Sequence, residues 1–409
     1  MTTLSIDDRS GSRPSRRTFG RAALVAGGSL ALGLSATPAL ARTPGSPAAP
    51  GAYAQRAVTA YDALQRTFYD AKTKLYAPNF PAQPGDNPYA YVYPYAGVIT
   101  ATLDLLRLDR GYASALRDRD EALAAYYNPA PASANPLSPP APASPPGYAS
   151  YVLPPLGGSG DLFYDDNEWL ALAALQQYRT TGDRAALRRA ELINTLVAYG
   201  WDDDPSHPDP GGTFWTQATY SHDRNTVSNG LGSEIASRLY LLTGKRTHLD
   251  RSLRQFAWVD RYLRAPNGLY WDHVDLDGTV NTAQLAYNQG NMLGAATLLH
   301  LATGERAYLT QAIDIAGTAL EVYGSSPTLS SDVPGAVTFF KNLFLLHSVH
   351  PDESYRRRQR EYADTLWATV DPATGLLPTD GGLAVNAQAA LVETQALAAW
   401  SPRDYHLLL

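Results

Sequence analysis

The sequence contains no cysteine among its 409 residues. Disulfide bonds, thiolate zinc sites and cysteine nucleophiles are therefore all excluded. The eight histidines show neither the HExxH pattern nor another spacing typical of metal ligands, so we expect no metal and no cofactor. A GxSxG nucleophile elbow and a glycine-rich phosphate-binding loop are also missing from the sequence. Any catalytic chemistry has to come from other side chains.

Long apolar runs are confined to the amino-terminal part of the chain. Ser15–Phe19 contains the paired arginines of a twin-arginine signal, and the apolar, glycine-containing stretch Ala22–Leu34 follows it. Ala39–Ala41 then provides small residues at the positions that a signal peptidase reads. The apolar stretch is too short, and too rich in glycine and serine, to favour a membrane anchor. We therefore predict a twin-arginine signal peptide over residues 1–41, and a secreted or cell-envelope protein without a membrane span after cleavage.

Positive charge is scarce, because 33 Lys and Arg stand against 39 Asp and Glu, a net charge of −6. Residues 1–41 hold five arginines and two aspartates, a net +3, so the remaining chain carries about −9. An acidic chain without a basic run is a poor partner for nucleic acid or an anionic membrane. Residues 42–409 are enough to bury a large core, and we expect a monomer.

Helical periodicity dominates the chain after residue 50. Ala, Leu, Arg and Gln, which favour helices, fill the periodic segments. An all-α fold is therefore expected. The twelve predicted helices begin near Gly51, Tyr93, Tyr112, Asn167, Arg184, Asn225, Thr247, Gln284, Glu305, Pro334, Glu353 and Val385.

Tight, polar turns connect five pairs of these helices. Gly182, Gly244 and Gly304 lie in three of the turns, where glycine can end a helix in the left-handed conformation. The three glycines recur at intervals of 62 and 60 residues, which indicates an internal repeat of helical hairpins. The five turns span 109–111, 181–183, 243–245, 303–305 and 350–352.

Long connections alternate with the tight turns, so the long loops should all lie on one rim of the assembly. The tight turns pair helices two to eleven, which leaves the first and last helices to pair with each other. We therefore predict an (α/α)6 barrel of six helical hairpins, as one domain over residues 42–409. An open solenoid is the alternative, but neither end has a polar capping helix. The long loops span 73–92, 127–165, 200–224, 265–283, 323–333 and 371–384.

Ten prolines lie between Pro129 and Pro155. Such a composition is typical of an extended linker and would suggest a domain boundary. The hairpin repeat continues on both sides of this segment, however. We therefore predict a proline-rich surface loop at 129–155, bordering the open rim of the barrel.

Aromatic, acidic and amide side chains gather in the long loops and at the helix starts beside them. Functional residues are common on loops that a rigid scaffold holds. Aromatic rings can stack on the apolar face of a sugar ring, and amides and acids can bind its hydroxyl groups. The candidates are Tyr89, Tyr91, Tyr93, Tyr95, Tyr164, Asp165, Asp166, Asn167, Phe214, Trp215, Asn225, Asn229, Tyr270, Trp271, Asp272, Tyr287, Asn288, Gln289, Phe340 and Lys341.

The segment Asp165-Asp166-Asn167-Glu168 precedes an apolar run. As a local pattern it is most simply a capping box, with Asp165 as the N-cap and Glu168 completing it. The alternative is catalytic. Two adjacent carboxylates at a helix start can come within the roughly 5 Å that a double displacement at an anomeric carbon requires. Repulsion between close carboxylates would keep one protonated and the other ionised, as acid and nucleophile need.

Four segments together resemble glycoside hydrolase family 76, the family of endo-α-1,6-mannanases and their fungal cell-wall relatives. The resemblance runs from about Gly51 to Trp400. One departure is Glu168, which stands where a small residue is expected. The segments are Tyr164–Trp169, Gly211–Trp215, Asn225–Gly230 and Tyr287–Gly290.

The resemblance implies a retaining mechanism in which Asp165 is the nucleophile and Asp166 the general acid/base. It also implies that other rim residues contact a polysaccharide substrate such as α-mannan. The residues that the resemblance implies are Trp215, Asn229, Tyr287, Asn288, Gln289, Phe340 and Lys341. Tyr164, Asn167, Trp271 and Asp272 are predicted as substrate contacts from their place on the loop rim.

Three alternatives to an α-mannan hydrolase stay open at this point. A transglycosylase would pass the same glycosyl-enzyme intermediate to a sugar hydroxyl instead of water. A glycan-binding protein on the same barrel would need neither aspartate. Uronyl hydrolases share the barrel, but the acidic chain argues against an acidic sugar.

Overall fold

The computed structural model describes residues 50–131, 143–323 and 332–409. All of them belong to one compact unit, Pro47–Leu409. The signal peptide predicted over residues 1–41 lies outside the described residues. The middle of the proline-rich loop and most of the loop 323–333 lie outside them as well.

Twelve α-helices make up most of the part of the chain that the structure describes. Each predicted helix start lies within three residues of an observed one; the largest difference is at α4, which begins at Tyr164 and not at Asn167. The helices are α1 (Pro50–Phe68), α2 (Val92–Leu108), α3 (Ala113–Leu123), α4 (Tyr164–Thr181), α5 (Arg184–Tyr199), α6 (Thr226–Thr243), α7 (Arg246–Tyr262), α8 (Ala286–Thr303), α9 (Arg306–Tyr323), α11 (Val333–Val349), α12 (Glu353–Trp367) and α13 (Val385–Ala399).

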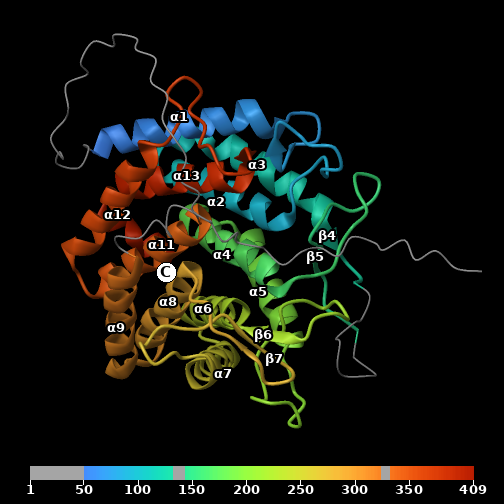
Figure 1. Ribbon diagram of the computed structural model, residues 1–409, viewed down its shortest axis with the longest axis vertical. Coiled ribbons are helices and arrows are strands. Elements are labelled where there is room, and N and C mark those ends of the chain that lie inside the picture. The colour runs from blue at the N-terminus through green and yellow to red at the C-terminus, as the bar shows by residue number, and fades with distance from the viewer. Residues whose placement is uncertain (1–49, 132–142, 324–331) are drawn as a thin grey trace, which may run out of the picture. The chain divides into compact units, whose positions relative to one another are not determined.

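Six of these helices form a closed inner ring (Figure 1). In order around the ring they are α2, α4, α6, α8, α11 and α13, and α13 packs against α2 to close it. The other helices lie outside, and the first of them, α1, packs along α13. The predicted pairing of first and last helices and the (α/α)6 barrel are confirmed, and an open solenoid is wrong.

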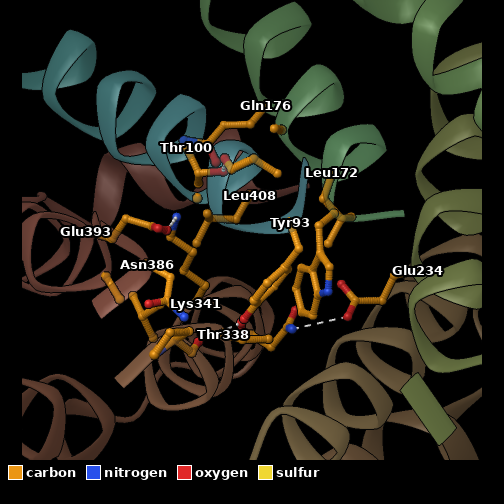
Figure 2. Close-up of a pocket in the computed structure, with 18 of the residues that line it drawn as sticks. Tyr93, Thr100, Leu172, Gln176, Glu234, Thr338, Lys341, Asn386, Glu393 and Leu408 are labelled. Carbon is orange, nitrogen blue, oxygen red and sulfur yellow. Dashed lines mark hydrogen bonds and ion pairs between the residues drawn. The ribbon is translucent and has the colours of Figure 1, made fainter. Parts of the chain in front are cut away.

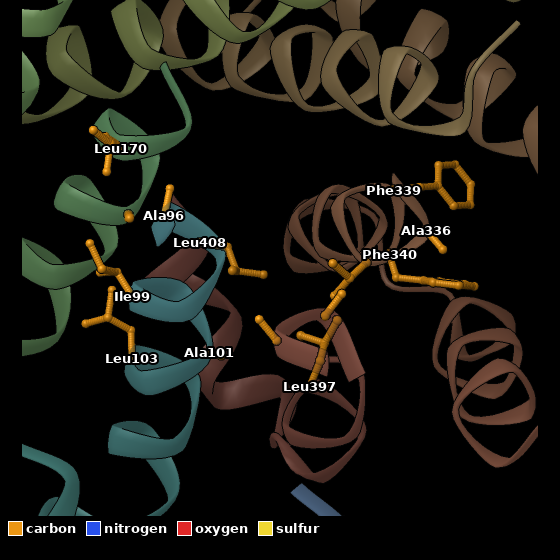
Figure 3. Packing of buried hydrophobic residues seen from close by; sticks show 14 of the residues in the cluster. Ala96, Ile99, Ala101, Leu103, Leu170, Ala336, Phe339, Phe340, Leu397 and Leu408 are labelled. Atoms are coloured by element: carbon orange, nitrogen blue, oxygen red, sulfur yellow. The ribbon is translucent and has the colours of Figure 1, made fainter. Parts of the chain in front are cut away.

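Burial explains which helices lie inside. On α6, every residue from Thr226 to Leu239 is buried, because neighbouring helices cover it on all sides. Its hairpin partner α7 buries only one stripe, which includes Leu249, Phe256 and Val259. Buried apolar residues of the inner helices meet side by side, as Figure 3 shows for α2, α4, α11 and α13. The apolar surface that these contacts remove from water stabilises the ring.

The three repeated glycines end α4, α6 and α8 in the same way. Gly182, Gly244 and Gly304 have φ values of 77°, 70° and 77°, in the left-handed region. The N–H of each donates to the carbonyl oxygen four residues earlier. The internal repeat seen in the sequence is therefore also a structural repeat.

Small antiparallel sheets join long loops that are far apart in the sequence. β3 (Asn79–Phe80) pairs with β9 (Leu383–Ala384), which links the first long loop to the last. β6 (Asp223–Asn225) pairs with β7 (His273–Asp275), and β7 pairs in turn with β8 (Val280–Asn281). These pairings bring the first long loop to the last, and the loop 200–224 to the loop 265–283.

The described ends of the proline-rich loop belong to the same rim. β4 (Tyr127–Asn128) and β5 (Gly147–Tyr148) pair across the loop, and the N–H of Val92 at the start of α2 donates to the Ser150 carbonyl. Tyr148 and Ser150 are buried. These contacts attach the loop to the barrel as a border of its rim. A further hairpin of the rim joins β1 (Tyr69–Asp70) and β2 (Leu75–Tyr76).

Candidate active site

The first turn of α4 holds the two candidate catalytic aspartates. The N-cap is Phe163, with no capping hydrogen bond from its side chain, so Asp165 and Asp166 are the second and third residues of the helix. The expected capping box is wrong, because Asp165 lies inside the helix and the Glu168 carboxyl has no hydrogen-bond partner among the described residues. The helix places both aspartates at its positive end, which favours a negative charge there.

Both aspartates are buried, with Asp165 3% and Asp166 8% exposed. The N–H of Asp166 donates to Oδ1 of Asp165 over 2.9 Å, which stabilises the ionised form of the Asp165 carboxylate. Successive residues of a helix point about 100° apart, so the two carboxylates leave the helix in different directions. The first turn of α4 thus presents two adjacent, buried carboxyl groups at the barrel mouth.

Asn167, the fourth residue of α4, binds the proline-rich loop. Its Oδ1 accepts the Tyr148 N–H over 2.8 Å, and its Nδ2 donates to the Tyr148 carbonyl over 2.9 Å. A third hydrogen bond runs from Nδ2 to the Phe163 carbonyl, over 2.8 Å. The amide is fully buried, so its predicted role as a substrate contact is not what the structure shows it doing. It fastens β5 beside the aspartates.

The fourth residues of α6 and α8 do the same for other loops. Oδ1 of Asn229 accepts the Thr213 N–H over 2.8 Å, and its Nδ2 donates to the Thr213 carbonyl over 3.2 Å. Oε1 of Gln289 accepts the Tyr270 N–H over 2.8 Å, and its Nε2 donates to the Tyr270 carbonyl over 2.9 Å. Each amide also donates to the carbonyl four residues earlier. We call Asn167, Asn229 and Gln289 the amide clamps; all three were expected to contact substrate, and all three are fully buried.

Tyr164 and Trp215 flank the start of α4 in different ways. Tyr164 is 1% exposed, and its ring lies so close to Gly200 that a Cβ there would meet it at 2.2 Å. Its role is packing. Trp215 is only partly buried, stands edge-on to Phe163 with ring centroids 4.9 Å apart, and accepts the Tyr164 N–H at its carbonyl. Of these two predicted contacts, the structure brings Trp215 to the rim beside the aspartates.

A second polar group lies at the start of α8. Nδ2 of Asn288 donates to Asp272 Oδ1 over 3.0 Å, and His273 Nδ1 lies 2.8 Å from Asp272 Oδ2. Burial lowers the pKa of His273, but the hydrogen bond and charge of Asp272 outweigh it and leave that pKa raised. Asn288 is the third residue of its helix, as Asp166 is of α4, so both belong to the same ring of first-turn positions.

Trp271 and Tyr287, the remaining predicted contacts of this region, are partly buried. The Trp271 carbonyl accepts the hydroxyl of Thr226, the first residue of α6, over 2.5 Å. Tyr287 is the second residue of α8. Both therefore lie at the rim, next to the loop-facing ends of inner helices.

Phe340 is buried in the core, whereas Lys341 is partly exposed and lines a pocket inside the ring. Nζ of Lys341 pairs with Asp104 over 2.8 Å and with Glu393 over 2.6 Å. Burial lowers the pKa of Lys341, but the two carboxylates outweigh it and the net shift is upward. Burial also raises the pKa of Glu393, to about 7. Phe340 packs against Tyr362 of α12, with centroids 5.2 Å apart, so it points away from the ring interior into the core.

A pocket that opens to solvent lies inside the ring (Figure 2), and neither Asp165 nor Asp166 is among the residues that line it. Trp169, one turn below Asp165 on α4, lines it together with Tyr93, whose ring centroid is 6.1 Å away. Lys341 and Glu393 line it from α11 and α13. The Leu408 side chain closes it near the carboxyl end of the chain.

The lining residues that were not candidates from the sequence include Glu234, Asn386 and Glu393. Asn386 is the second residue of α13, just as Asp165 is of α4. Its place in the first turn of an inner helix is the signal that could have found it. Glu234 and Glu393 lie deeper, and in the sequence they read as ordinary helix residues.

The described residues contain no group of three or more histidine, aspartate or glutamate side chains arranged to hold a metal ion. Over the same parts of the chain, none of the helices is both long and apolar enough to cross a membrane.

A closed ring of six hairpins with two adjacent buried aspartates at its mouth defines a class, the (α/α)6-barrel proteins with the paired acids of glycoside hydrolases. Residues 52–338 match the model of glycosyl hydrolase family 76. The chain belongs to this family.

Solved structures share the fold. A family 76 mannosidase of Bacteroides thetaiotaomicron superposes with a TM-score of 0.73 at 21% identity, over 85% of this chain and 98% of that chain. The α-1,6-mannanase of Salegentibacter sp. HEL1_6 gives a TM-score of 0.67 at 20% identity, over 85% and 99%. At these identities the likeness concerns the fold.

Similarity to characterised sequences is more local. A mannan endo-1,6-alpha-mannosidase of Saccharomyces cerevisiae is 30% identical over 131 residues, which cover 30% of this chain and 28% of that protein. The corresponding protein of Candida glabrata is 33% identical over 122 residues, or 28% and 26% of the two chains. The matched stretch spans less than a third of either relative.

Proposed function

We propose that this protein is a retaining glycoside hydrolase that cleaves α-1,6-mannosidic linkages in a mannan-type polysaccharide. The observation that carries the proposal is the pair Asp165 and Asp166, buried in the first turn of an inner helix at the mouth of the barrel. The relatives support the choice of substrate. The Salegentibacter mannanase is inactive as a variant with two consecutive aspartates replaced by asparagine, which was solved with α-1,6-mannotriose.

In the proposed mechanism, a carboxylate oxygen of Asp165 forms a bond to the anomeric carbon while the glycosidic C–O bond breaks. Asp166 gives its proton to the departing oxygen. It then takes a proton from water, which attacks the anomeric carbon and releases Asp165. Two inversions at one carbon give a product with the configuration of the substrate. The hydrogen bond from the Asp166 N–H to Asp165 favours Asp165 as the ionised partner.

Substrate contacts are proposed for the rim residues that are not fully buried. Trp215, Trp271 and Tyr287 keep part of their side chains accessible, and Asp272 is one-fifth exposed. Aromatic rings of this kind can cover the apolar face of a mannose unit, while a carboxylate accepts hydrogen bonds from its hydroxyl groups.

The stereochemistry of the first product tests the mechanism. Wild type, Asp165→Asn and Asp166→Asn are incubated with linear α-1,6-mannan, and the anomer released is followed by NMR. We expect the α anomer from wild type and no product from either variant. Asp380→Asn, which changes an exposed carboxylate of a rim loop, is the matched control and should behave as wild type. Initial release of the β anomer would contradict the retaining mechanism, and activity in both variants would exclude the site.

We also propose that residues 1–41 direct twin-arginine export and that residues 42–409 form the mature, monomeric enzyme. The paired arginines and the Ala39–Ala41 site support this proposal. The amino terminus of the protein recovered outside the cytoplasm should be Arg42. Replacement of Arg16 and Arg17 by lysine should leave the chain inside the cell. Export that persists in this variant would argue against the twin-arginine route.

A further inference from the structure

Glu168 is the most unusual side chain near the aspartates. It is 0% exposed, and neither carboxyl oxygen has a hydrogen-bond partner in the described part of the chain. It lies three residues after Asp165, so the two side chains are neighbours on one helix face. A buried carboxylate without donors is far less stable than the neutral acid.

Two nearby cations are already paired with other acids. Arg238 binds Glu234 over 2.6 Å, and Lys341 binds Asp104 and Glu393. Burial raises the pKa of Glu168 well above its usual value, and the charges of Asp165 and Glu234 raise it further. No described cation is placed to reverse this shift.

The structural repeat shows that the fold does not need a carboxyl group at this position. Glu168 is the fifth residue of α4, and the fifth residues of α6 and α8 are Gly230 and Gly290. Those glycines lie where helices approach closely, so that a Cβ on Gly290 would meet the Phe339 Cα at 2.8 Å. At the same position on α4, the helix carrying the aspartates, a whole side chain is accommodated.

We propose that Glu168 is a neutral, protonated acid in the working protein, beside an ionised Asp165. The pair then holds one negative charge, and that charge stays on Asp165. The helix amino terminus and the Asp166 N–H favour the charge at Asp165, whereas Glu168 has neither. A neutral Glu168 thus leaves Asp165 as the anion that a nucleophile has to be. This consequence rests on the proposed nucleophilic role, but the protonation of Glu168 does not.

Other ionisable groups on the elements around α4 are few. α2 contributes Tyr93 and Asp104, and α6 contributes Glu234 and Arg238. The buried positions of α5 carry no ionisable side chain. The carboxyl-terminal 3-10 helix Pro402–Leu408 adds buried Asp404 and Tyr405 at the other end of the barrel. Among the described residues, the charges that raise the pKa of Glu168 are those of Asp165 and Glu234.

The pH dependence of stability tests the protonation state. An acid that keeps its proton in the folded protein but loses it when unfolded costs stability as the pH rises between the two pKa values. Glu168→Gln removes this cost. The folding equilibrium constant of the variant relative to the parent should therefore rise by up to tenfold per pH unit above the ordinary glutamate pKa.

The ratio of the two folding equilibrium constants is obtained by urea unfolding of parent and variant between pH 5 and 9, at steps of about one pH unit. Glu305→Gln, at an exposed site, is the matched control and should give a flat ratio. A ratio for Glu168→Gln that is flat or falls with pH overturns the proposal. If this variant folds poorly, Glu168→Ala removes the same ionisable group. Its loss of packing lowers the folding equilibrium constant equally at every pH, so the change of the ratio with pH still reports the protonation of Glu168.

Two infrared measurements test the protonation state of Glu168 directly. Difference infrared spectra should show a protonated carboxyl band at neutral pH in the parent that is missing in Glu168→Gln. In Asp165→Asn that band should titrate at lower pH, because the neighbouring charge is gone. Absence of the band, or an unmoved titration, overturns the proposal, and both readouts stand even for a protein inactive on mannan.

The acid limb of kcat/KM on α-1,6-mannan completes the test. If Glu168 is neutral across this limb, Glu168→Gln leaves the limb at the same pH as in the parent. A limb that moves to lower pH by about one unit would mean that a charge had been removed beside Asp165, which contradicts the proposal.

Discussion

The first turns of α4 and of its repeat partners α6 and α8 share a scaffold but not a chemistry. Each helix has an amide clamp at its fourth residue and ends at a left-handed glycine. At the second and third positions, however, α4 carries Asp165 and Asp166, where α6 has Val227 and Ser228 and α8 has Tyr287 and Asn288.

The comparison separates what the repeat needs from what the site needs. The clamps and terminal glycines recur because each hairpin has to fasten a long loop at one end and reverse direction at the other. Of the three helices, only α4 has acidic residues at its second and third positions, although the backbone is alike in all three. One hairpin thus carries the candidate catalytic residues, and the other two form part of the barrel around them.

The largest effect on activity is expected when the second and third residues of α4 are replaced by those of α6. In the double variant Asp165→Val, Asp166→Ser we expect activity on α-1,6-mannan to fall by at least about a thousandfold, since both nucleophile and acid are removed. Circular dichroism should show an unchanged helix content, because α6 forms with these residues. Retained activity would show that the chemistry lies in another part of the rim.

The fifth helix position separates the repeats next. Gly290→Ala on α8 should lower the free energy of unfolding by about 3 kcal/mol, because the new Cβ would meet the Phe339 backbone at 2.8 Å. In Gly230→Ala on α6, the nearest atom to the new Cβ would be the Asn291 Cβ, at 3.1 Å. A gain in helix propensity of about 1 kcal/mol should offset that contact. Equal costs in urea unfolding would contradict this difference.

Loss of an amide clamp should have an intermediate effect. Asn167→Ala and Asn229→Ala each leave a backbone N–H and carbonyl without a partner, so each should cost about 2 kcal/mol of unfolding free energy. Only Asn167→Ala should also lower kcat on mannan strongly, because it frees β5 next to the aspartates. If kcat falls equally in both variants, the clamps do not differ in function.

The smallest effect is expected at the helix ends. Gly182→Ala, Gly244→Ala and Gly304→Ala should each cost about 1 kcal/mol, because alanine is strained at positive φ while the space around each glycine is open. The three costs, measured by urea unfolding, should agree, and kcat/KM should not change. A large loss of activity in any of them would show coupling across the barrel.

Most of the fold could be predicted because it is encoded locally. Glycine spacing and helical periodicity gave twelve helix starts, and the alternation of tight and long connections gave the ring. The start of α4 was placed three residues late because Tyr164, Asp165 and Asp166 read as loop or cap residues. In the folded protein Tyr164 packs against Gly200, a contact that the sequence does not reveal.

The candidate site was predicted less completely. Its aspartates were found from a motif, but the hydrogen bonds of the amide clamps to loop backbone were not predicted, because buried and exposed amides look alike in a sequence. The ion pairs of Lys341 could not be predicted either, since its partners Asp104 and Glu393 lie 237 and 52 residues away and no local pattern joins them. Side-chain direction on an inner helix is decided by the closed ring.

The packing of α1 along α13 also determines when this protein can finish folding. During synthesis, α1 is the first of these helices to emerge and its partner α13 is the last. The apolar face of α1 therefore stays uncovered until nearly the whole chain has been made. Contacts between residues so far apart in sequence form slowly. The intermediate hairpins can assemble in order, but the nascent chain keeps an open edge until α13 is available. Such an edge is a natural binding surface for a chaperone.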